Sequence, residues 1–233
     1  MGKKNNVSTI LWLILLGMGG SCQKNRQEPA PQDTSYFPLQ IGDYWIYQIV
    51  QEKYITTNSS VKYLYQFQER ISSSYYQNNQ LFYLIEESMR QTEQSGWKLT
   101  GFHTVYKSPS EVITQENNVF VVALAFPIAL TTFWNSNVYN TRPDTLLHYQ
   151  NLGHSFAVGQ LGFKNTVSVA GANDSTLVNQ IKKLRVYAPN IGLVYREETV
   201  VAFCQSSSAC IGKSMIESGT KLTWELIAGN RLP

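Results

Sequence analysis

Several residue types and patterns that mark catalytic or nucleic-acid-binding proteins are scarce in this sequence or missing from it. Of its three histidines, His148 and His154 are six residues apart, a poor spacing for shared metal ligation on one strand. No Gly-x-Ser-x-Gly nucleophile motif is present. The only basic cluster, Lys182, Lys183 and Arg185, is too small for a nucleic-acid-binding face. We therefore expect no catalytic residue, no metal ligand, no cofactor and no nucleic-acid partner.

A long apolar run is missing as well. Residues 10–18 form an apolar stretch of nine residues, whereas a membrane-spanning helix needs about 20. The basic residues Lys3 and Lys4 precede this stretch, and small residues follow it at 19–21. This order predicts a secretory signal peptide at residues 1–21. Its removal lowers the count of Lys+Arg from 19 to 17, against 16 Asp+Glu, so the mature chain is nearly neutral.

A cysteine stands directly after the predicted signal peptide. Ser21-Cys22 resembles the end of a bacterial lipoprotein signal, where a small residue precedes the cysteine that is lipidated. The resemblance implies that Cys22 carries a diacylglycerol thioether and further acyl chains such as palmitate, which together anchor a protein stably. Gln23 stands where an aspartate would indicate inner-membrane retention in enteric bacteria, which favours the outer membrane. The alternative is an ordinary signal peptide with an incidental cysteine.

The segment that follows Cys22 is polar. Residues 23–35 contain two prolines and no large apolar side chain, so they cannot bury enough surface to offset their ordering entropy. We predict a disordered tether at residues 22–35 and a single β domain at residues 36–233.

Alternation of apolar and polar residues with a period of two dominates the predicted domain. Between Val61 and Ile71, and again at Leu222, Trp224 and Leu226, apolar residues alternate with polar ones. Such alternation is typical of antiparallel strands with one wet face, and no long helical period with caps occurs. The sequence predicts an all-β fold of about ten or eleven mostly antiparallel strands in a curved sheet, either a half-barrel or a sandwich.

For two stretches the sequence pattern allows more than one local structure. Val119–Phe126 is apolar on both faces, which predicts either a central strand covered on both sides or a strand that lines a cavity. A buried helix is the alternative that its length leaves open, although its valines favour a strand. Residues 131–136 could form a helical turn. We expect few or no other helices.

The remaining two cysteines are close in sequence. Cys204 and Cys210 are separated by five small residues, and an even pair in an oxidising compartment predicts a disulfide, here at a hairpin tip. The alternatives are free thiols, a metal site, which would need further ligands, and redox chemistry, which usually has two intervening residues.

Three stretches of the domain carry a family resemblance. Residues 36–47 follow the pattern FPL-x-x-G-x-x-W-x-Y, residues 126–135 form a second element, and residues 186–197 form a late hairpin. Together they resemble uncharacterised outer-membrane lipoproteins of Bacteroidota, of the Cytophagales type. The likeness covers most of the chain from Tyr36 onward, and it implies a cellular location without implying a chemistry.

Aromatic residues are the most unusual part of the composition, at 12% of the chain. Trp45, Trp97 and Trp134 are the candidate ligand-facing aromatics, although most aromatics are expected in a β core. The adjacent acidic pairs Glu86-Glu87 and Glu197-Glu198 cannot each act as one acid/base couple, because neighbours on a strand point to opposite faces.

These observations favour a lipid-anchored envelope protein that is a non-catalytic binding or scaffold module for an apolar ligand. The first alternative is a carbohydrate-binding surface lipoprotein, and the second is a hydrolase. A closed apolar cavity of about 300 Å³ or more would favour the apolar ligand. A solvent-facing aromatic row would favour a glycan, and a convergence of histidine with carboxylates would favour an enzyme.

Overall fold

Twelve strands make up nearly all the regular structure in the computed structural model, which describes residues 1–2, 33–57 and 59–233. The signal peptide, Cys22 and most of the predicted tether lie outside the described residues. Among the described residues, no helix is long and apolar enough to cross a membrane. The elements are η1 (Asp33–Tyr36), a single 3-10 turn, and the strands β1 (Tyr44–Thr56), β2 (Ser59–Gln77), β3 (Gln80–Arg90), β4 (Lys98–Lys107), β5 (Glu111–Glu116), β6 (Val119–Ala125), β7 (Phe133–Asn135), β8 (Leu146–Val158), β9 (Leu161–Ser175), β10 (Asn179–Ala188), β11 (Gly192–Phe203) and β12 (Ile216–Gly229).

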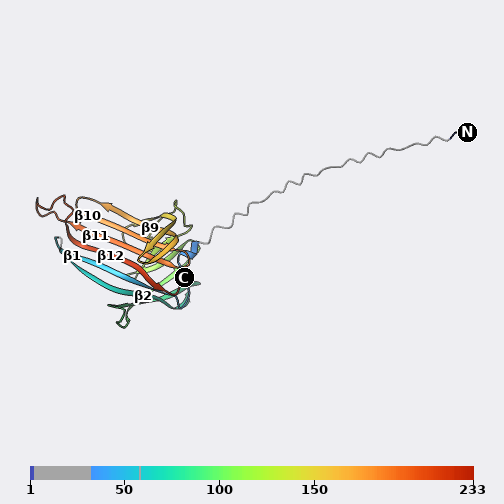
Figure 1. Ribbon diagram of the computed structural model, residues 1–233, viewed down its shortest axis with the longest axis horizontal. Coiled ribbons are helices and arrows are strands. Elements are labelled where there is room, and N and C mark those ends of the chain that lie inside the picture. Colours follow the sequence, from blue (N-terminus) through green and yellow to red (C-terminus); the bar gives the residue numbers. More distant parts are fainter. Residues whose placement is uncertain (3–32, 58) are drawn as a thin grey trace. The chain divides into compact units, whose positions relative to one another are not determined.

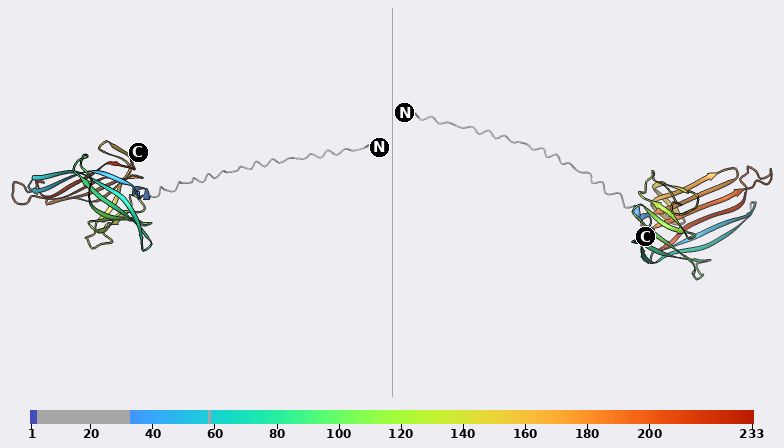
Figure 2. Two further views of the ribbon diagram at one scale, coloured as in Figure 1. Left: turned by 90° about the horizontal axis from the view of Figure 1, so that it is seen from below. Right: turned by 180° about the vertical axis from the view of Figure 1, so that it is seen from behind.

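The strands form one antiparallel sheet in the order β6-β5-β4-β3-β2-β1-β12-β11-β10-β9-β8-β7. Neighbours in this order are consecutive in the sequence except β1 and β12, which pair at the middle of the sheet. The consecutive strands β6 and β7 stand at the two ends of the order. Figures 1 and 2 show the sheet curling on itself. The all-β prediction is confirmed, with twelve strands where the sequence indicated ten or eleven.

The two outer strands, β6 and β7, nearly close the sheet into a barrel-like form. The Val122 N–H donates to the Ser136 carbonyl at 2.9 Å. The Trp134 indole N–H and the Ser136 hydroxyl both donate to the Val122 carbonyl, each at 3.1 Å. These bonds satisfy backbone groups that an open sheet edge would leave unpaired.

The helical turn that the sequence allowed at residues 131–136 is wrong. Phe133–Asn135 form the short strand β7, which pairs with β8. The Asn135 side-chain oxygen accepts from the backbone N–H groups of Asn137 and Thr145 at 3.0 Å each. This side chain therefore fixes the chain reversal after β7, and three residues are too few for a strand period to be read from the sequence.

The interior follows from the period-two alternation. On β1, Trp45, Tyr47 and Ile49 are at most 5% exposed, whereas the residues between them are half-buried. Burying each large apolar side chain contributes about 2 kcal/mol. Val119–Ala125, the stretch that is apolar on both faces, is the strand β6 and contributes four consecutive buried residues. It is not a central strand, because β6 stands at one end of the sheet order, and Ala123 lines the cavity described below.

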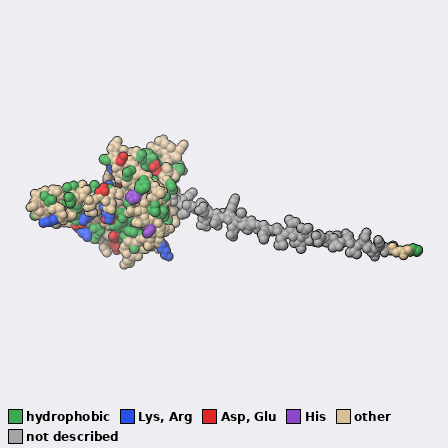
Figure 3. Space-filling view, turned by 90° about the horizontal axis from the view of Figure 1, so that it is seen from above, with side chains coloured by type: hydrophobic (Ala, Val, Ile, Leu, Met, Phe, Trp, Pro, Cys, Tyr) green, Lys and Arg blue, Asp and Glu red, His purple; other side chains and the backbone are tan. Residues whose placement is uncertain are grey.

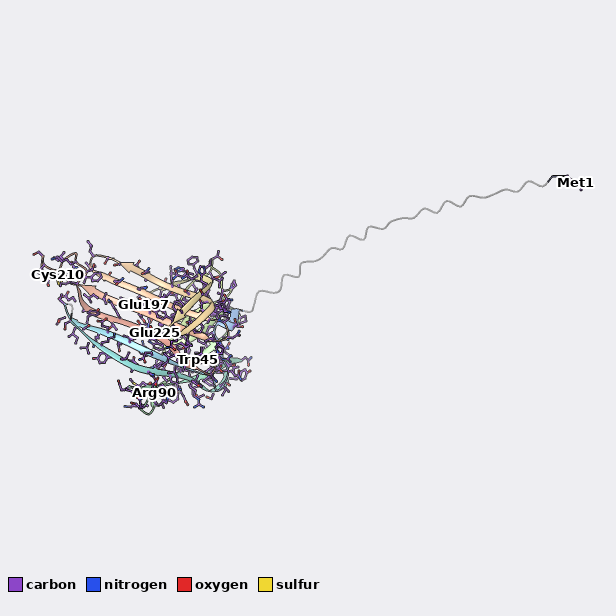
Figure 4. The ribbon with its side chains drawn as sticks, in the orientation of Figure 1. Met1, Trp45, Arg90, Glu197, Cys210 and Glu225 are labelled. Carbon is purple, nitrogen blue, oxygen red and sulfur yellow. A yellow bond between two sulfur atoms is a disulfide. The ribbon has the colours of Figure 1, made fainter. Side chains whose placement is uncertain are left out.

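The long strands extend away from this closed part of the sheet. Figure 4 shows Cys210 at one end of these strands and Trp45 toward the other. A disulfide joins Cys204 to Cys210, with 5.7 Å between their Cα atoms, in the loop between β11 and β12. On the face shown in Figure 3, uncharged side chains predominate and charged ones occur in small groups.

Candidate ligand-binding cavity

The nearly closed sheet forms a cavity of about 610 Å³ that is partly open to solvent. Its lining comes from strands at both sides of the β1/β12 junction and from the segment that leads into β1. Ligand pockets in proteins usually have volumes of about 300 to 1,000 Å³. Aromatic side chains line much of it, and these include Phe37, Trp45, Tyr47, Phe67, Tyr187 and Trp224.

The aromatic part of the lining is centred on Trp224. Its ring centroid lies 5.4 Å from that of Tyr47 and 4.9 Å from that of Phe67. The Trp45 indole N–H donates to the Ile191 carbonyl at 2.6 Å. The buried indole N–H of Trp224, by contrast, has no hydrogen-bond partner among the described residues. A buried donor without a partner is costly, so this atom marks a place where a ligand acceptor would be stabilising.

Two ion pairs form a charged side of the cavity. Arg185 on β10 contacts Glu116 on β5 at 2.6 Å, and Arg196 contacts Glu198 on β11 at 3.0 Å. The Arg185 charge lowers the pKa of Glu116 despite burial. Burial alone would raise the pKa of Glu198, but the charge of Arg196 and its hydrogen bond outweigh burial and lower it. Both carboxylates are therefore ionised at neutral pH.

A second polar group lies on the three neighbouring strands β2, β3 and β4. Glu69 on β2 is directly opposite Glu87 on β3 in the strand register, and Glu87 is opposite Gly101 on β4. His103 is two residues beyond Gly101 and so projects from the same face of β4. Its Nδ1 lies 2.7 Å from Oε1 of Glu87.

The pKa values of Glu69 and His103 are both raised. Burial raises the pKa of Glu69, and the nearby charge of Glu87 adds to this rise while His103 opposes it. Burial alone would lower the pKa of His103, but the hydrogen bond to Glu87 and the charge of Glu69 outweigh it, so the pKa is raised. Within the described part of the chain, the Glu69 carboxylate makes no hydrogen bond and no ion pair at contact distance.

The structure separates the three tryptophans that the sequence singled out. Trp45 lines the cavity. Trp97 lies just before β4, outside the cavity lining, with the Arg90 guanidinium 4.4 Å above its ring. Trp134 is 9% exposed and donates its indole N–H to the backbone of β6, so it serves closure of the sheet.

The three histidines do not converge. His148 stacks on Phe133 with ring centroids 5.5 Å apart, His154 is exposed on β8, and only His103 lines the cavity. The grouping of His103 with Glu69 and Glu87 was not predicted from the sequence. A signal for it exists, because Glu69 occupies the inward phase of β2 between Phe67 and Ile71.

Comparisons with known proteins found no matching family model and no matching curated protein. Two solved structures match by shape. One is a "putative exported protein with YmcC-like fold" from Bacteroides fragilis, with a TM-score of 0.43 and 11% identity over 83% of this chain and 98% of that one. The other is a "putative lipoprotein" from Parabacteroides distasonis, with a TM-score of 0.37 and 13% identity over 82% and 98% of the two chains. These matches assign the chain to no family.

Proposed function

We propose that this protein is a lipid-anchored envelope protein whose β domain binds a small, largely apolar molecule inside the sheet. The observation that carries the proposal is the cavity of about 610 Å³, in which an aromatic side faces a polar side that carries four glutamates, two arginines and His103. In small-molecule sites the apolar contacts supply affinity and the polar groups fix the orientation of the ligand.

The lining restricts the chemistry of the ligand. An apolar ring or chain fits against Tyr47, Phe67 and Trp224, and a hydrogen-bond acceptor on the ligand would satisfy the Trp224 indole N–H. Glu69, Glu87, Glu116 and Glu198 outnumber the two arginines of the lining, so a strongly anionic ligand is disfavoured.

The anchor is argued from the sequence, since Cys22 lies outside the described residues. The short apolar stretch, the small residues and Cys22 give the order of a lipoprotein signal, and Gln23 favours the outer membrane. Lipidation would keep the domain beside a bilayer, where apolar molecules partition.

We propose binding without catalysis. The convergence of His103 with Glu69 and Glu87 is the feature that would favour an enzyme, and it is the one observation on the side of the hydrolase alternative. Arg185 and Arg196 are paired with carboxylates of the cavity, as is His103. Among the described residues, no serine, threonine or cysteine side chain hydrogen-bonds to His103, so the arrangement of a nucleophile with its base is not formed there.

Titration with the neutral fluorescent probe N-phenyl-1-naphthylamine tests the cavity. We expect saturable binding of one probe per chain. Leu222 is half-buried on the cavity lining, so Leu222→Trp should fill the space and weaken probe binding by at least about tenfold. Leu146→Trp is the matched control, because Leu146 is 68% exposed and lies outside the lining.

Circular dichroism would establish that both variants are folded. Probe binding that is absent from the unaltered protein, or that survives Leu222→Trp with unchanged affinity, would contradict the proposal.

A further inference from the structure

Three side chains that line the cavity, those of Glu69, Glu87 and His103, could bind one metal ion together. Each of Glu69, Glu87 and His103 offers an atom that can bind a metal ion, and these three atoms all lie within 4.8 Å of one another. The side chains come from neighbouring strands of one sheet, which holds their backbones rigidly. Rigid elements position metal ligands more accurately than loops do.

The three ligand atoms lie near enough to reach one ion after small side-chain movements. Nδ1 of His103 and Oε1 of Glu87 are 2.7 Å apart, a hydrogen-bond distance. Zinc bonds to imidazole nitrogen and carboxylate oxygen are about 2.1 Å long, so two ligands of one tetrahedral ion stand about 3.4 Å apart, and this pair would separate by about 0.7 Å on binding.

The Glu87 carboxylate lies beside Gly101, which has no side chain to restrict its movement. A Cβ atom at Gly101 would lie 3.1 Å from Oε2 of Glu87, which is tighter than ordinary contact. Gly101 is directly opposite Glu87 in the register, and it lines the same cavity. The side chain that would restrict this carboxylate is therefore missing.

Charge also favours a cation at this place. Glu69 and Glu87 face each other on adjacent strands, and like charges directly opposite are destabilising. The Glu69 carboxylate makes no hydrogen bond or contact ion pair within the described residues. An ion between the two carboxylates would turn this repulsion into attraction.

We propose that Glu69, Glu87 and His103 form a binding site for a divalent first-row transition metal ion. An imidazole nitrogen beside two carboxylates suits Zn²⁺ or Mn²⁺, whereas Ca²⁺ and Mg²⁺ take oxygen ligands. The site needs no organic ligand in the cavity, so it stands independently of the proposed function.

Isothermal titration of tag-free protein with ZnSO₄, MnCl₂ and CaCl₂ tests the site. We expect one Zn²⁺ or Mn²⁺ per chain at neutral pH and no comparable Ca²⁺ binding. Glu69→Gln should weaken binding by at least about 100-fold, because it removes one of three protein ligands. This variant is expected to fold, since the amide keeps the shape of a carboxylate whose charge burial disfavours.

Two matched controls separate this site from surface binding. Glu86→Gln changes the neighbouring carboxylate, which points out of the cavity, and His154→Gln changes an exposed histidine. Both variants should bind the metal as the unaltered protein does.

The absence of saturable Zn²⁺ and Mn²⁺ binding would overturn the proposal, as would equal affinity for Ca²⁺. Binding that survives Glu69→Gln, or that is lost in His154→Gln, would show an adventitious surface site instead. Metal binding without probe binding, or the reverse, would show which of the two proposals fails.

Discussion

At the scale of single residues, the ion pair of Arg185 and Glu116 joins parts of the sheet that are not neighbours. Arg185 is on β10 and Glu116 on β5, and these strands are far apart in the sheet order, so the pair spans the interior. Both side chains are less than one third exposed. Removing one partner of such a pair leaves a charge that is poorly solvated.

We expect Arg185→Met to lower the free energy of unfolding by about 2 kcal/mol, a discounted value because water reaches both groups. The double variant Arg185→Met with Glu116→Gln should recover most of this loss, since it leaves no unpaired charge. Urea denaturation measures both. A double variant no more stable than Arg185→Met would show that the pair is not the cause.

Lys107 provides a pH-dependent prediction. Burial, and then the charge of Arg231, lower its pKa from 10.5 to about 8, and its Nζ donates to the Thr34 carbonyl at 3.0 Å. Between these two pKa values the unfolded chain binds more protons than the folded one, so the contribution of Lys107 to stability rises with pH from about 8 to 10.5.

Lys107→Met should remove this rise, which we expect to be about 1 kcal/mol after allowance for solvent screening. Thermal unfolding at pH 7 to 10 measures it. Lys98→Met on the same strand is the control, because Lys98 is exposed. An unchanged pH profile in Lys107→Met would contradict the assignment.

At the scale of strands, close backbone approach fixes the pairing of β12. Gly219 has a φ of +121°, and a Cβ atom there would lie 2.2 Å from the carbonyl oxygen of Val200 on β11. A Cβ atom at Gly162 on β9, by contrast, would have no other atom within 4 Å beyond its immediate chain neighbours. Any side chain at Gly219 would therefore separate two paired strands, whereas one at Gly162 would meet solvent.

We expect Gly219→Ala to lower the free energy of unfolding by about 3 kcal/mol, from backbone strain and overlap together. Gly162→Ala should change it by less than about 0.5 kcal/mol. Denaturant titration compares the two variants, and equal effects would be inconsistent with the pairing of β11 with β12.

The strand scale is also where the sequence was most informative. Long alternating stretches such as Val61–Ile71 and Leu222–Leu226 lie within β2 and β12. Strand β8 gives no comparable alternation, because its register with β9 is interrupted around Asn151 and Gly153, which both have positive φ. Such interruptions break the period on which strand prediction depends.

At the scale of the whole molecule, the cavity could not be read from the sequence. Its groups come from strands that are distant in sequence, and the register that sets Glu69 opposite Glu87 depends on hairpin geometry. The sequence did place Trp224 on an inward phase, because Leu222, Trp224 and Leu226 alternate with polar residues, whereas Trp45 lies between Tyr44 and Ile46. Polar residues in the inward phase, such as Glu69, are the pattern that would have indicated the site.

Lipidation of Cys22 would determine where the whole molecule is held. We expect Cys22→Ala to abolish incorporation of a palmitate analogue and to leave the protein soluble or unprocessed, because no thiol remains at the predicted cleavage point. Metabolic labelling and membrane fractionation measure both effects. The matched control is the double variant Cys204→Ser with Cys210→Ser, which should still be labelled. Label retained by Cys22→Ala would refute the anchor.

Native mass spectrometry of the protein extracted from its own envelope tests the role of the cavity most directly. The account predicts a fraction of chains with one bound small molecule, which dissociates on collisional activation and is missing from Leu222→Trp. Chains that carry only their covalent modification, or a bound molecule that Leu222→Trp retains, would contradict it.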